Sequence, residues 1–428
     1  MESIVQQTVQ KSKIFFKALM IGGLVLILLI PAMLVQNLVK EREGRQQEAF
    51  DEVSSKWAGA QNITGPVLVL PYEERVTTPG PVRSVRKQAY ILPDKLTIEG
   101  EIKPEERHRG IYQVMLYSSE LNMSGQFNSI PLNQLRIDPV SVLWNEAHVC
   151  VDLQDARGLK EEMQLKWNDS VVTLNPASVD NAVMKKAFTA PVSVSADGRI
   201  NFSAKIRFNG SRELLFTPVG RETTVKLNSA WTEPSFTGGQ LPDHNVTKEG
   251  FTATWKSLSH TRTFPQAWKE TSYNLENASF GTSLFIPVNG YQKTMRSVKY
   301  AILCIVLTFA AFFIIEMVNK KSVHPIQYGL VGIALLMFYT LLLSFSEYIG
   351  FNMAYVVATV ATVGLIGWFV KGVLSSGKLS WLLSVLLALL YGYVFTILQL
   401  QDYSLLLGSI GLFATLAVIM HFCRKIQW

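Results

Sequence analysis

The sequence predicts a membrane protein of mixed fold: six transmembrane α-helices with a large β-rich, sandwich-like extracytoplasmic domain inserted between helix 1 and helix 2. Three observations support this prediction. Charged residues make up 17% of the 428 residues and the mean hydropathy is +0.20, whereas soluble domains carry about 25% charged residues. Six apolar runs reach the length of a spanning helix. The region between the first two, residues 39–298, consists largely of short alternating segments.

The six apolar runs are each close to the ~20 residues that a helix needs to cross a bilayer. After the first run and the insert, the other five form a C-terminal bundle over residues 299–422. The first run is too long for the apolar core of a signal peptide and lacks an A-x-A-type exit, so we interpret it as an uncleaved anchor. The predicted spans are residues 17–38, 299–318, 326–346, 353–371, 379–398 and 404–422.

Basic residues mark one side of the predicted membrane. They flank the spans in four places, all on the same side, whereas the short loops 346–352 and 400–404 on the other side contain none. The positive-inside rule therefore predicts that residues 1–16 and 423–428 are cytoplasmic and that residues 39–298 lie outside. The flanking basic residues are Lys11, Lys13, Lys17, Lys320, Lys321, Lys371, Lys378, Arg424 and Lys425.

The external region begins with a charged helix and continues as strands. Residues 39–59 keep a helical apolar stripe, which predicts either a stalk that extends the first span or a separate surface helix. An Asp-Gly pair within residues 193–210 is the strongest hairpin signal, and residues 155–170 suit a little helix. Further strands are predicted within residues 65–72, 111–128, 251–258 and 279–288.

Ionisable residues near the ends of the spans are the candidate functional or interfacial residues. Glu316 is the eighteenth residue of the second span, which at 1.5 Å per residue places it near the cytoplasmic headgroups. Lys320 follows at i+4, so the spacing favours an interfacial ion pair over a proton or ion relay. His324 lies just before the third span, whose first turn contains a proline. Glu347 lies at the outer end of that span.

Patterns typical of catalysis and of nucleotide or metal binding are absent from the sequence. It contains no G-x-x-x-x-G-K-[ST], H-E-x-x-H, G-x-S-x-G or C-x-x-C motif. His148 and Cys150 are either a metal pair or, as the spacing favours, neighbours on one face of a strand. The carboxylates of residues 103–108 fit a charged loop, and Asp155 with Arg157 fits a local ion pair that shapes a turn. We therefore predict no catalytic, cofactor-binding or metal site, and no enzyme.

The net charge of +7 does not predict nucleic-acid binding. Residues 40–299 contain 31 basic and 29 acidic side chains, so the excess lies beside the spans rather than in a basic groove. Cys150 is the only cysteine of residues 39–298. This region therefore cannot contain an internal disulfide.

Several segments of the chain are distinctive, and their order along the chain is informative. They are LLIPAMLV (28–35), RGIY (109–112), DARGL (155–159), WTEPSF (231–236), GFTATW (250–255), KYAILCIVLTFAAFFIIEMV (299–318), HPIQYGLVGIALLMFYTLLLSFSEYIGF (324–351), AY (354–355) and LLLGS (405–409). Together these segments resemble the CreD family of bacterial inner-membrane proteins. The resemblance spans nearly the whole chain, and its C-terminal block is the most specific part. It implies one N-terminal span, a periplasmic domain and a membrane bundle, with a role in envelope integrity, a two-component system of the same name and tolerance to certain colicins. It implies no catalytic or ligand residue.

We therefore expect a non-enzymatic, multi-pass protein of the cell inner membrane with an envelope-integrity or envelope-stress role. Its periplasmic domain would bind or sense an envelope component, and its partners would be the lipid bilayer and an envelope protein, lipid or glycan. The alternative is a membrane transporter or lipid-handling protein that works through the C-terminal bundle, with Thr359, Thr362 and Gln399 along a path. A periplasmic hydrolase has the least support, because no nucleophile–base or metal pattern is found.

Overall fold

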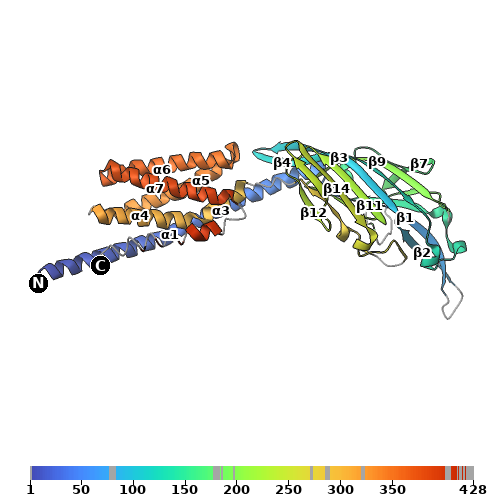
Figure 1. Cartoon of the computed structure of the whole chain (residues 1–428), viewed down its shortest axis with the longest axis horizontal. Helices are drawn as coiled ribbons and strands as arrows, with labels where there is room; N and C mark the ends of the chain where they lie inside the picture. The colour runs from blue at the N-terminus through green and yellow to red at the C-terminus, as the bar shows by residue number, and fades with distance from the viewer. Residues whose placement is uncertain are drawn as a thin grey trace. The chain divides into compact units, whose positions relative to one another are not determined.

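The chain forms two compact units, which are described separately. One unit comprises Met1–Glu48 and Val288–Trp428, and the other comprises Ala49–Pro287. Figure 1 shows the helices of the first unit and the strands of the second. The computed structural model describes residues 2–76, 83–176, 184, 187–195, 198–269, 273–284, 290–319, 323–400, 406–411, 413, 417 and 420.

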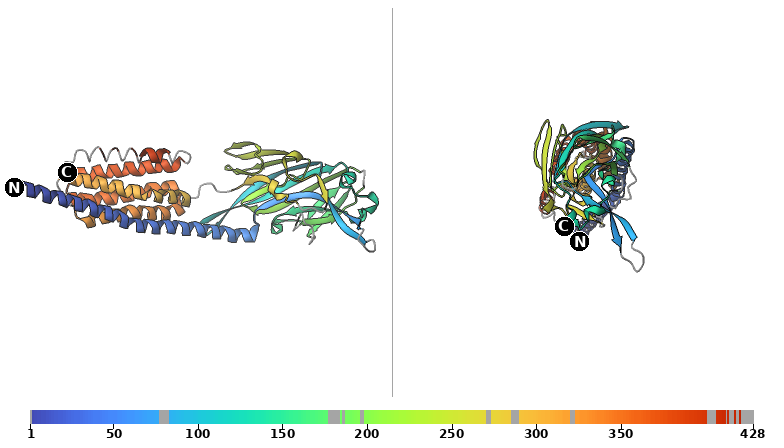
Figure 2. Two further views of the ribbon diagram at one scale, coloured as in Figure 1. Left: turned by 90° about the horizontal axis from the view of Figure 1, so that it is seen from below. Right: turned by 90° about the vertical axis from the view of Figure 1, so that its right-hand side faces the viewer.

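The helical unit is built from long apolar helices. Helices α4 to α7 lie side by side in Figures 1 and 2. Among the residues that the structure describes, four helices are long and apolar enough to cross a membrane, and a fifth crossing results if α3 and α4, which meet at a 42° bend, form one span. The helices are α1 Glu2–Trp57, α3 Gly290–Lys299, α4 Ala301–Asn319, α5 Pro325–Ile349, α6 Phe351–Leu374 and α7 Gly377–Gln399.

Of the six predicted spans, four correspond to such helices, or five if α3 and α4 form one span. The sixth predicted span, residues 404–422, lies largely outside the described residues. Helix α1 continues without interruption through Pro31 and through residues 39–57, so the stalk alternative describes this segment better than a separate surface helix does. Proline removes one backbone donor from a helix, and here α1 nevertheless stays continuous.

Helix α1 packs on the other helices along a narrow stripe. From residue 15 onward, where the side chains of α1 are described, its buried apolar residues in this unit are Leu28, Ala32 and Val39. A Cβ atom on Gly332 of α5 would lie 2.3 Å from Leu28 Cδ1 and 3.0 Å from Phe309 Cζ, so glycine permits the close approach of α1, α4 and α5. Only 11% of the most apolar window of α1 is buried, compared with 33–44% for α5 to α7. Helix α1 is therefore the most peripheral of these helices.

The β unit consists of sixteen described strands joined in one hydrogen-bonded path. The path runs β12-β16-β10-β1-β5-β8-β7-β6-β9-β4-β3-β11-β14-β13, with β2 and β15 branching from β1. The strands are β1 Gln61–Val76, β2 Arg83–Ile91, β3 Lys95–Arg109, β4 Tyr112–Phe127, β5 His148–Leu153, β6 Met163–Trp167, β7 Ser170–Pro176, β8 Ala187–Pro191, β9 Ile200–Ser211, β10 Glu213–Phe216, β11 Glu222–Ser229, β12 Ser235–Gly238, β13 Asp243–Thr247, β14 Gly250–Leu258, β15 Ala267–Lys269 and β16 Phe280–Ser283. Short helical segments are α2 Leu132–Leu135 and the 3-10 turns Pro139–Ser141, Trp144–Glu146, Ala156–Gly158, Ser259–Thr261 and Glu276–Ala278.

Strands from the two ends of this path pack against each other through aromatic rings. Trp255 of β14 stacks on Phe280 of β16 at 5.8 Å between ring centroids. Phe236 of β12 meets Phe251 of β14 at 5.8 Å and His244 of β13 at 4.8 Å. The two ends of the path, β12 and β13, are thus close to each other, and Figure 2 gives two further views of these strands. In a sheet that buries one face, apolar and polar residues alternate along each strand. Strand β9 shows this, since its residues alternate between buried and exposed along most of its length.

The β-rich character predicted from the sequence is confirmed, and one local prediction within it is wrong. Residues 193–210 do not form a hairpin, because β8 pairs with β5 and β7 whereas β9 pairs with β4 and β6. Asp197 of the Asp-Gly pair lies outside the described residues. Two pairs in the sheet are parallel, β1 with β10 and β3 with β11. Such pairs join segments far apart in the chain, which a local turn signal cannot indicate.

Candidate functional site

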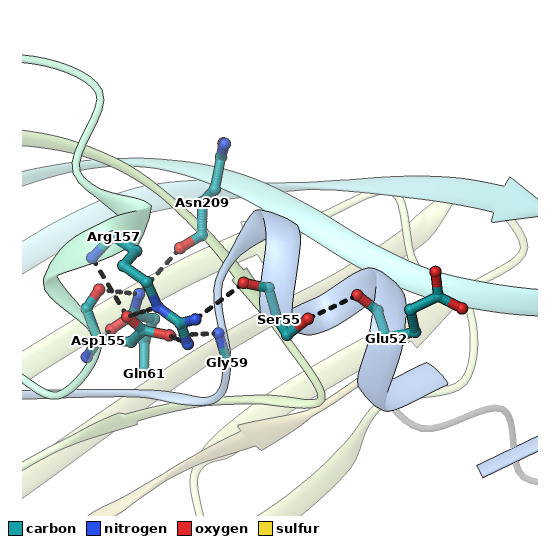
Figure 3. Close-up of polar contacts among 7 residues, drawn as sticks. All are labelled: Glu52, Ser55, Gly59, Gln61, Asp155, Arg157 and Asn209. Carbon is teal, nitrogen blue, oxygen red and sulfur yellow. Dashed lines mark hydrogen bonds and ion pairs between the residues drawn. The ribbon is translucent and has the colours of Figure 1, made fainter. Parts of the chain in front are cut away.

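The C-terminal end of α1 is built into the β unit by a polar network. Figure 3 shows the side chains that form it. The Arg157 guanidinium donates a hydrogen bond from Nη1 to the Ser55 carbonyl, at 2.8 Å, in the last turn of α1. A helix leaves its last carbonyls without partners, and a cation near them is favourable. Arg157 therefore satisfies the helix end from a different part of the chain.

Asp155 holds this arginine and the residue that follows the helix. Arg157 donates to both carboxylate oxygens, from Nε to Oδ1 at 2.9 Å and from Nη2 to Oδ2 at 2.7 Å. The Gly59 amide donates to Oδ2 at 2.8 Å. Hydrogen bonding by Arg157 lowers the pKa of Asp155 to about 2, against a smaller opposing effect of burial and with further help from the Gly59 amide. The carboxylate thus stays ionised and fixes the segment that leaves α1.

Gln61, at the start of β1, completes the network. Its side-chain oxygen accepts from the Asp155 amide at 3.1 Å, and Nε2 donates to the carbonyls of Asp155 and Asn209, both at 2.9 Å. Gln61 is fully buried. We name the network formed by Asp155, Arg157, Gln61 and the α1 end the helix clamp. The ion pair predicted between Asp155 and Arg157 is present, but its use in holding α1 was not foreseen.

Further contacts bind the last turns of α1 to the sheet. Trp57 Nε1 donates to the Tyr117 carbonyl at 3.3 Å. The Arg212 guanidinium pairs with Asp51 at 2.5 Å and lies over the Phe50 ring at 4.6 Å from its centroid. These contacts position the end of α1 on β4 and β9, beside the helix clamp.

In the helical unit, Glu316 near the end of α4 is the most buried ionisable residue that was predicted. It is only 6% exposed. Its carboxylate pairs with Lys17 of α1 and accepts from the Val323 amide at 3.0 Å and from the Tyr328 hydroxyl at 2.9 Å. Lys17 also donates to the Val323 carbonyl at 2.6 Å. The predicted partner, Lys320, lies outside the described residues, so the described cation partner of Glu316 comes from α1 instead.

The other two predicted residues, Glu347 and His324, contact neighbouring helices or cap a helix. Glu347 near the end of α5 accepts from the Tyr291 hydroxyl at 2.9 Å and lies 4.0 Å from Arg42 Nε of α1. His324 caps α5, because its Nδ1 accepts from the Ile326 amide at 3.3 Å and its own amide donates to Gln327 Oε1 at 3.0 Å. This reciprocal arrangement is a capping box. Glu316 and Glu347 therefore both tie α1 to the other helices.

Comparison with known proteins gives the family. A family model described as "Inner membrane protein CreD" matches residues 13–428. The chain is 31% identical to the Inner membrane protein CreD of Escherichia coli (strain K12) over 426 residues, which cover 98% of this chain and 94% of that protein. The chain belongs to the CreD family. The resemblance noted from the sequence is therefore confirmed.

The CreD match includes every attachment of α1. Lys17, Arg42, the helix clamp, Glu316 and Glu347 all lie within residues 13–428. The DARGL segment forms the 3-10 turn Ala156–Gly158 with Asp155 as its cap. In this CreD protein, a family-like segment of the β unit thus holds the end of the first helix.

The predicted pair of His148 and Cys150 occupies β5 of this CreD protein. Cys150 is fully buried, whereas the His148 ring is partly exposed and its Nδ1 lies 3.1 Å from the Glu146 carbonyl. Among the described residues, no group of three or more His, Cys, Asp or Glu side chains is arranged to hold a metal ion. The two residues are thus both part of β5, with Cys150 in the core and His148 partly exposed.

Replacing Asp155 by asparagine should make the CreD protein less sensitive to acid. The folded pKa of about 2 lies below the ordinary value of 3.8, so the ionised carboxylate contributes stability above about pH 4 that is lost as the pH falls towards 2. A shift of this size corresponds to about 2 kcal/mol. Urea unfolding of the full chain in detergent between pH 6 and pH 2.5, followed by tryptophan fluorescence, measures the loss.

The control for this prediction is Asp243→Asn, since Asp243 is an exposed residue of β13. The wild type and Asp243→Asn should lose the same amount of stability between pH 6 and pH 2.5. Asp155→Asn should be less stable than the wild type at pH 6 and should lose less stability over this pH range. Equal acid slopes for all three proteins would show that Asp155 is not held by Arg157 in solution.

Proposed function

We propose that this CreD family member is a non-enzymatic envelope protein of the bacterial inner membrane. Its β unit binds or senses an envelope component in the periplasm, and α1 passes the state of that unit to the membrane helices. The observation that carries the proposal is that α1 contributes residues to both units and has specific polar attachments in each.

The attachments in the β unit suit the transmission of a small movement. The helix clamp uses a two-point contact between Arg157 and Asp155 and a direct bond to a helix carbonyl. Bidentate pairs of this kind depend strongly on geometry. A ligand that shifts the Asp155 segment, which lies between β5 and β6, would therefore act directly on the end of α1.

The attachments in the helical unit would pass a shift of α1 to the other helices. Lys17 and Arg42 of α1 pair with Glu316 and Glu347, and the rest of the α1 contact is narrow. Twenty-five residues of helix separate the two basic residues, about 38 Å at 1.5 Å per residue. The helix is thus held at two well-separated points, and a shift along its axis changes both pairs.

The orientation in this proposal follows from the charges. The loops that carry lysine and arginine alternate with loops that carry none, which supports cytoplasmic termini and a periplasmic β unit. A periplasmic position gives the β unit access to lipids, glycans and proteins of the envelope. The helices themselves supply the contact with the lipid bilayer.

Photo-crosslinking in living cells tests the binding part of the proposal. Benzoylphenylalanine would replace the exposed apolar residues Val140, Val171 and Leu241, which are 91%, 63% and 75% exposed. The buried Val225 of β11 is the control position. A discrete protein, lipid or glycan captured from an exposed position supports the proposal. No specific capture from any of the three would contradict it.

An Arg157→Met variant tests the transmission part. We expect this variant to retain the captured species while failing to restore the envelope barrier of a deletion strain, measured as growth in the presence of bile salt. The matched control is Arg207→Met, which removes an exposed arginine that pairs with Glu120 and Glu161, neither of which belongs to α1. If Arg157→Met restores the barrier as well as Arg207→Met does, α1 does not transmit the state of the β unit.

A further inference from the structure

Four helices of the bundle each bring one polar side chain into a single buried cluster. The cluster consists of Cys304 of α4, Tyr339 of α5, Tyr355 of α6 and Tyr391 of α7, which are all 3% exposed or less. The three tyrosine rings surround Phe338, with centroid distances of 4.9, 5.2 and 4.4 Å. Tyr339 and Tyr391 both lie fourteen residues into their helices, so they occupy the same level of the bundle.

The hydrogen bonds of this cluster are incomplete. The Tyr355 hydroxyl donates to the Tyr391 carbonyl at 2.9 Å. The Tyr391 hydroxyl is buried without an acceptor among the described residues. The Tyr339 hydroxyl meets only the Cys304 thiol, a weak hydrogen-bonding group. Two fully buried phenols therefore lack a good partner in a region where bulk water is absent.

A third hydroxyl on the same side of α6 repeats the pattern. Thr359 follows Tyr355 by one turn, and its hydroxyl is also buried without a partner among the described residues. Threonines in a membrane helix can bond to the carbonyl four residues earlier. Thr308 and Thr396 do so, at 2.6 and 3.0 Å. Thr359 does not form this bond, which again indicates an acceptor that the described residues do not provide.

The chemistry of the cluster defines what it can bind. It offers phenol and alcohol donors and no charged side chain, so an anionic group would enter the bundle without a counter-charge, which is unfavourable. The surrounding rings of Phe338, Phe351 and Phe395 suit an apolar body. We propose that the cluster is a binding site for a neutral amphipathic lipid, whose carbonyl or hydroxyl oxygen accepts hydrogen bonds from Tyr339 and Tyr391.

The test uses substitutions that remove only one oxygen atom. Tyr339→Phe and Tyr391→Phe are compared with Tyr348→Phe, which removes the hydroxyl of a tyrosine outside the cluster that is 75% exposed. Each full-length protein is purified in a mild detergent. Co-purified lipid is quantified by mass spectrometry, and the midpoint of thermal unfolding is measured before and after exhaustive delipidation.

The expected result is about one neutral lipid per chain in the wild type. Tyr339→Phe and Tyr391→Phe should each reduce this lipid at least fivefold and lower the unfolding midpoint, whereas Tyr348→Phe should retain the lipid. Delipidation should lower the midpoint of the wild type to that of Tyr391→Phe. These effects concern the bundle and do not depend on the function proposed for the β unit.

The sign of the stability change separates the proposal from its rivals. If the phenols are simply unsatisfied, removing them relieves a buried polar group, so the midpoint rises or stays unchanged and the proposal is overturned. If the midpoint falls but the wild type carries no lipid, ordered water fills the site, and the proposal is again overturned. Equal loss of lipid from Tyr348→Phe would show that lipid is held at the surface and not in the cluster.

Discussion

A Lys17→Met variant is expected to lose about 3–5 kcal/mol of stability in the helical unit. The substitution leaves the Glu316 carboxylate buried at 6% exposure without its cation, and an uncompensated buried charge is strongly destabilising. Glu316 would keep its bonds to the Val323 amide and the Tyr328 hydroxyl, which cannot replace a full positive charge. Thermal unfolding of the purified chain in detergent should show a marked decrease in the midpoint.

The double variant Lys17→Met with Glu316→Met provides the decisive comparison. Apolar side chains in place of a buried ion pair are often nearly neutral in stability, so the double variant should recover most of the loss. Lys378→Met, at an exposed position in the first turn of α7, controls for the removal of a lysine. A single variant as stable as the control, or a double variant as unstable as the single one, would contradict a buried pair.

A Gly158→Ala variant should destabilise the β unit by about 1–3 kcal/mol and loosen the helix clamp. A Cβ atom at this position would lie 2.2 Å from the Asn209 carbonyl oxygen and 2.6 Å from Gln61 Nε2. One neighbour is backbone and the other is held by two hydrogen bonds, so neither can move cheaply. Overpacking of this kind typically costs 1–3 kcal/mol. Urea unfolding of the full chain, followed by tryptophan fluorescence, measures the loss.

Gly239→Ala is the matched control in the same unit. No atom lies within 4 Å of a Cβ placed on Gly239, so this variant should unfold at the urea concentration of the wild type. If Gly158→Ala also unfolds at the urea concentration of the wild type, the 3-10 turn Ala156–Gly158 is not packed against Gln61 in solution.

Local patterns in the sequence predicted those features that local physics determines. The long helices follow from apolar length, the start of α5 follows from the proline after His324, and the ion pair of Asp155 with Arg157 follows from their separation of two residues. The β-rich character follows from alternation, which is strong in β9. Each of these depends on residues within one or two turns of each other.

The features that sequence reasoning missed depend on distant residues. Glu316 pairs with Lys17, 299 positions away, whereas the spacing suggested the lysine four residues ahead. The helix clamp joins Ser55 to Arg157 across 102 positions. The tyrosine cluster was overlooked because each tyrosine stands alone in an apolar run, where it resembles an ordinary core residue. The signal for the cluster lies only in the equal depth of Tyr339 and Tyr391 in α5 and α7.

The parallel pairing of β1 with β10 has a consequence for how the protein is made. Strand β1 leaves the ribosome soon after α1, but its parallel neighbour β10 follows about 150 residues later and β16 closes that edge at Phe280–Ser283. At roughly 5–20 residues per second, synthesis of the intervening chain takes many seconds. The first three residues of β1, Gln61–Ile63, must wait through this interval without their β10 partners. The sheet is completed only as the next membrane helix emerges, so folding of the β unit and insertion of the bundle become nearly simultaneous events.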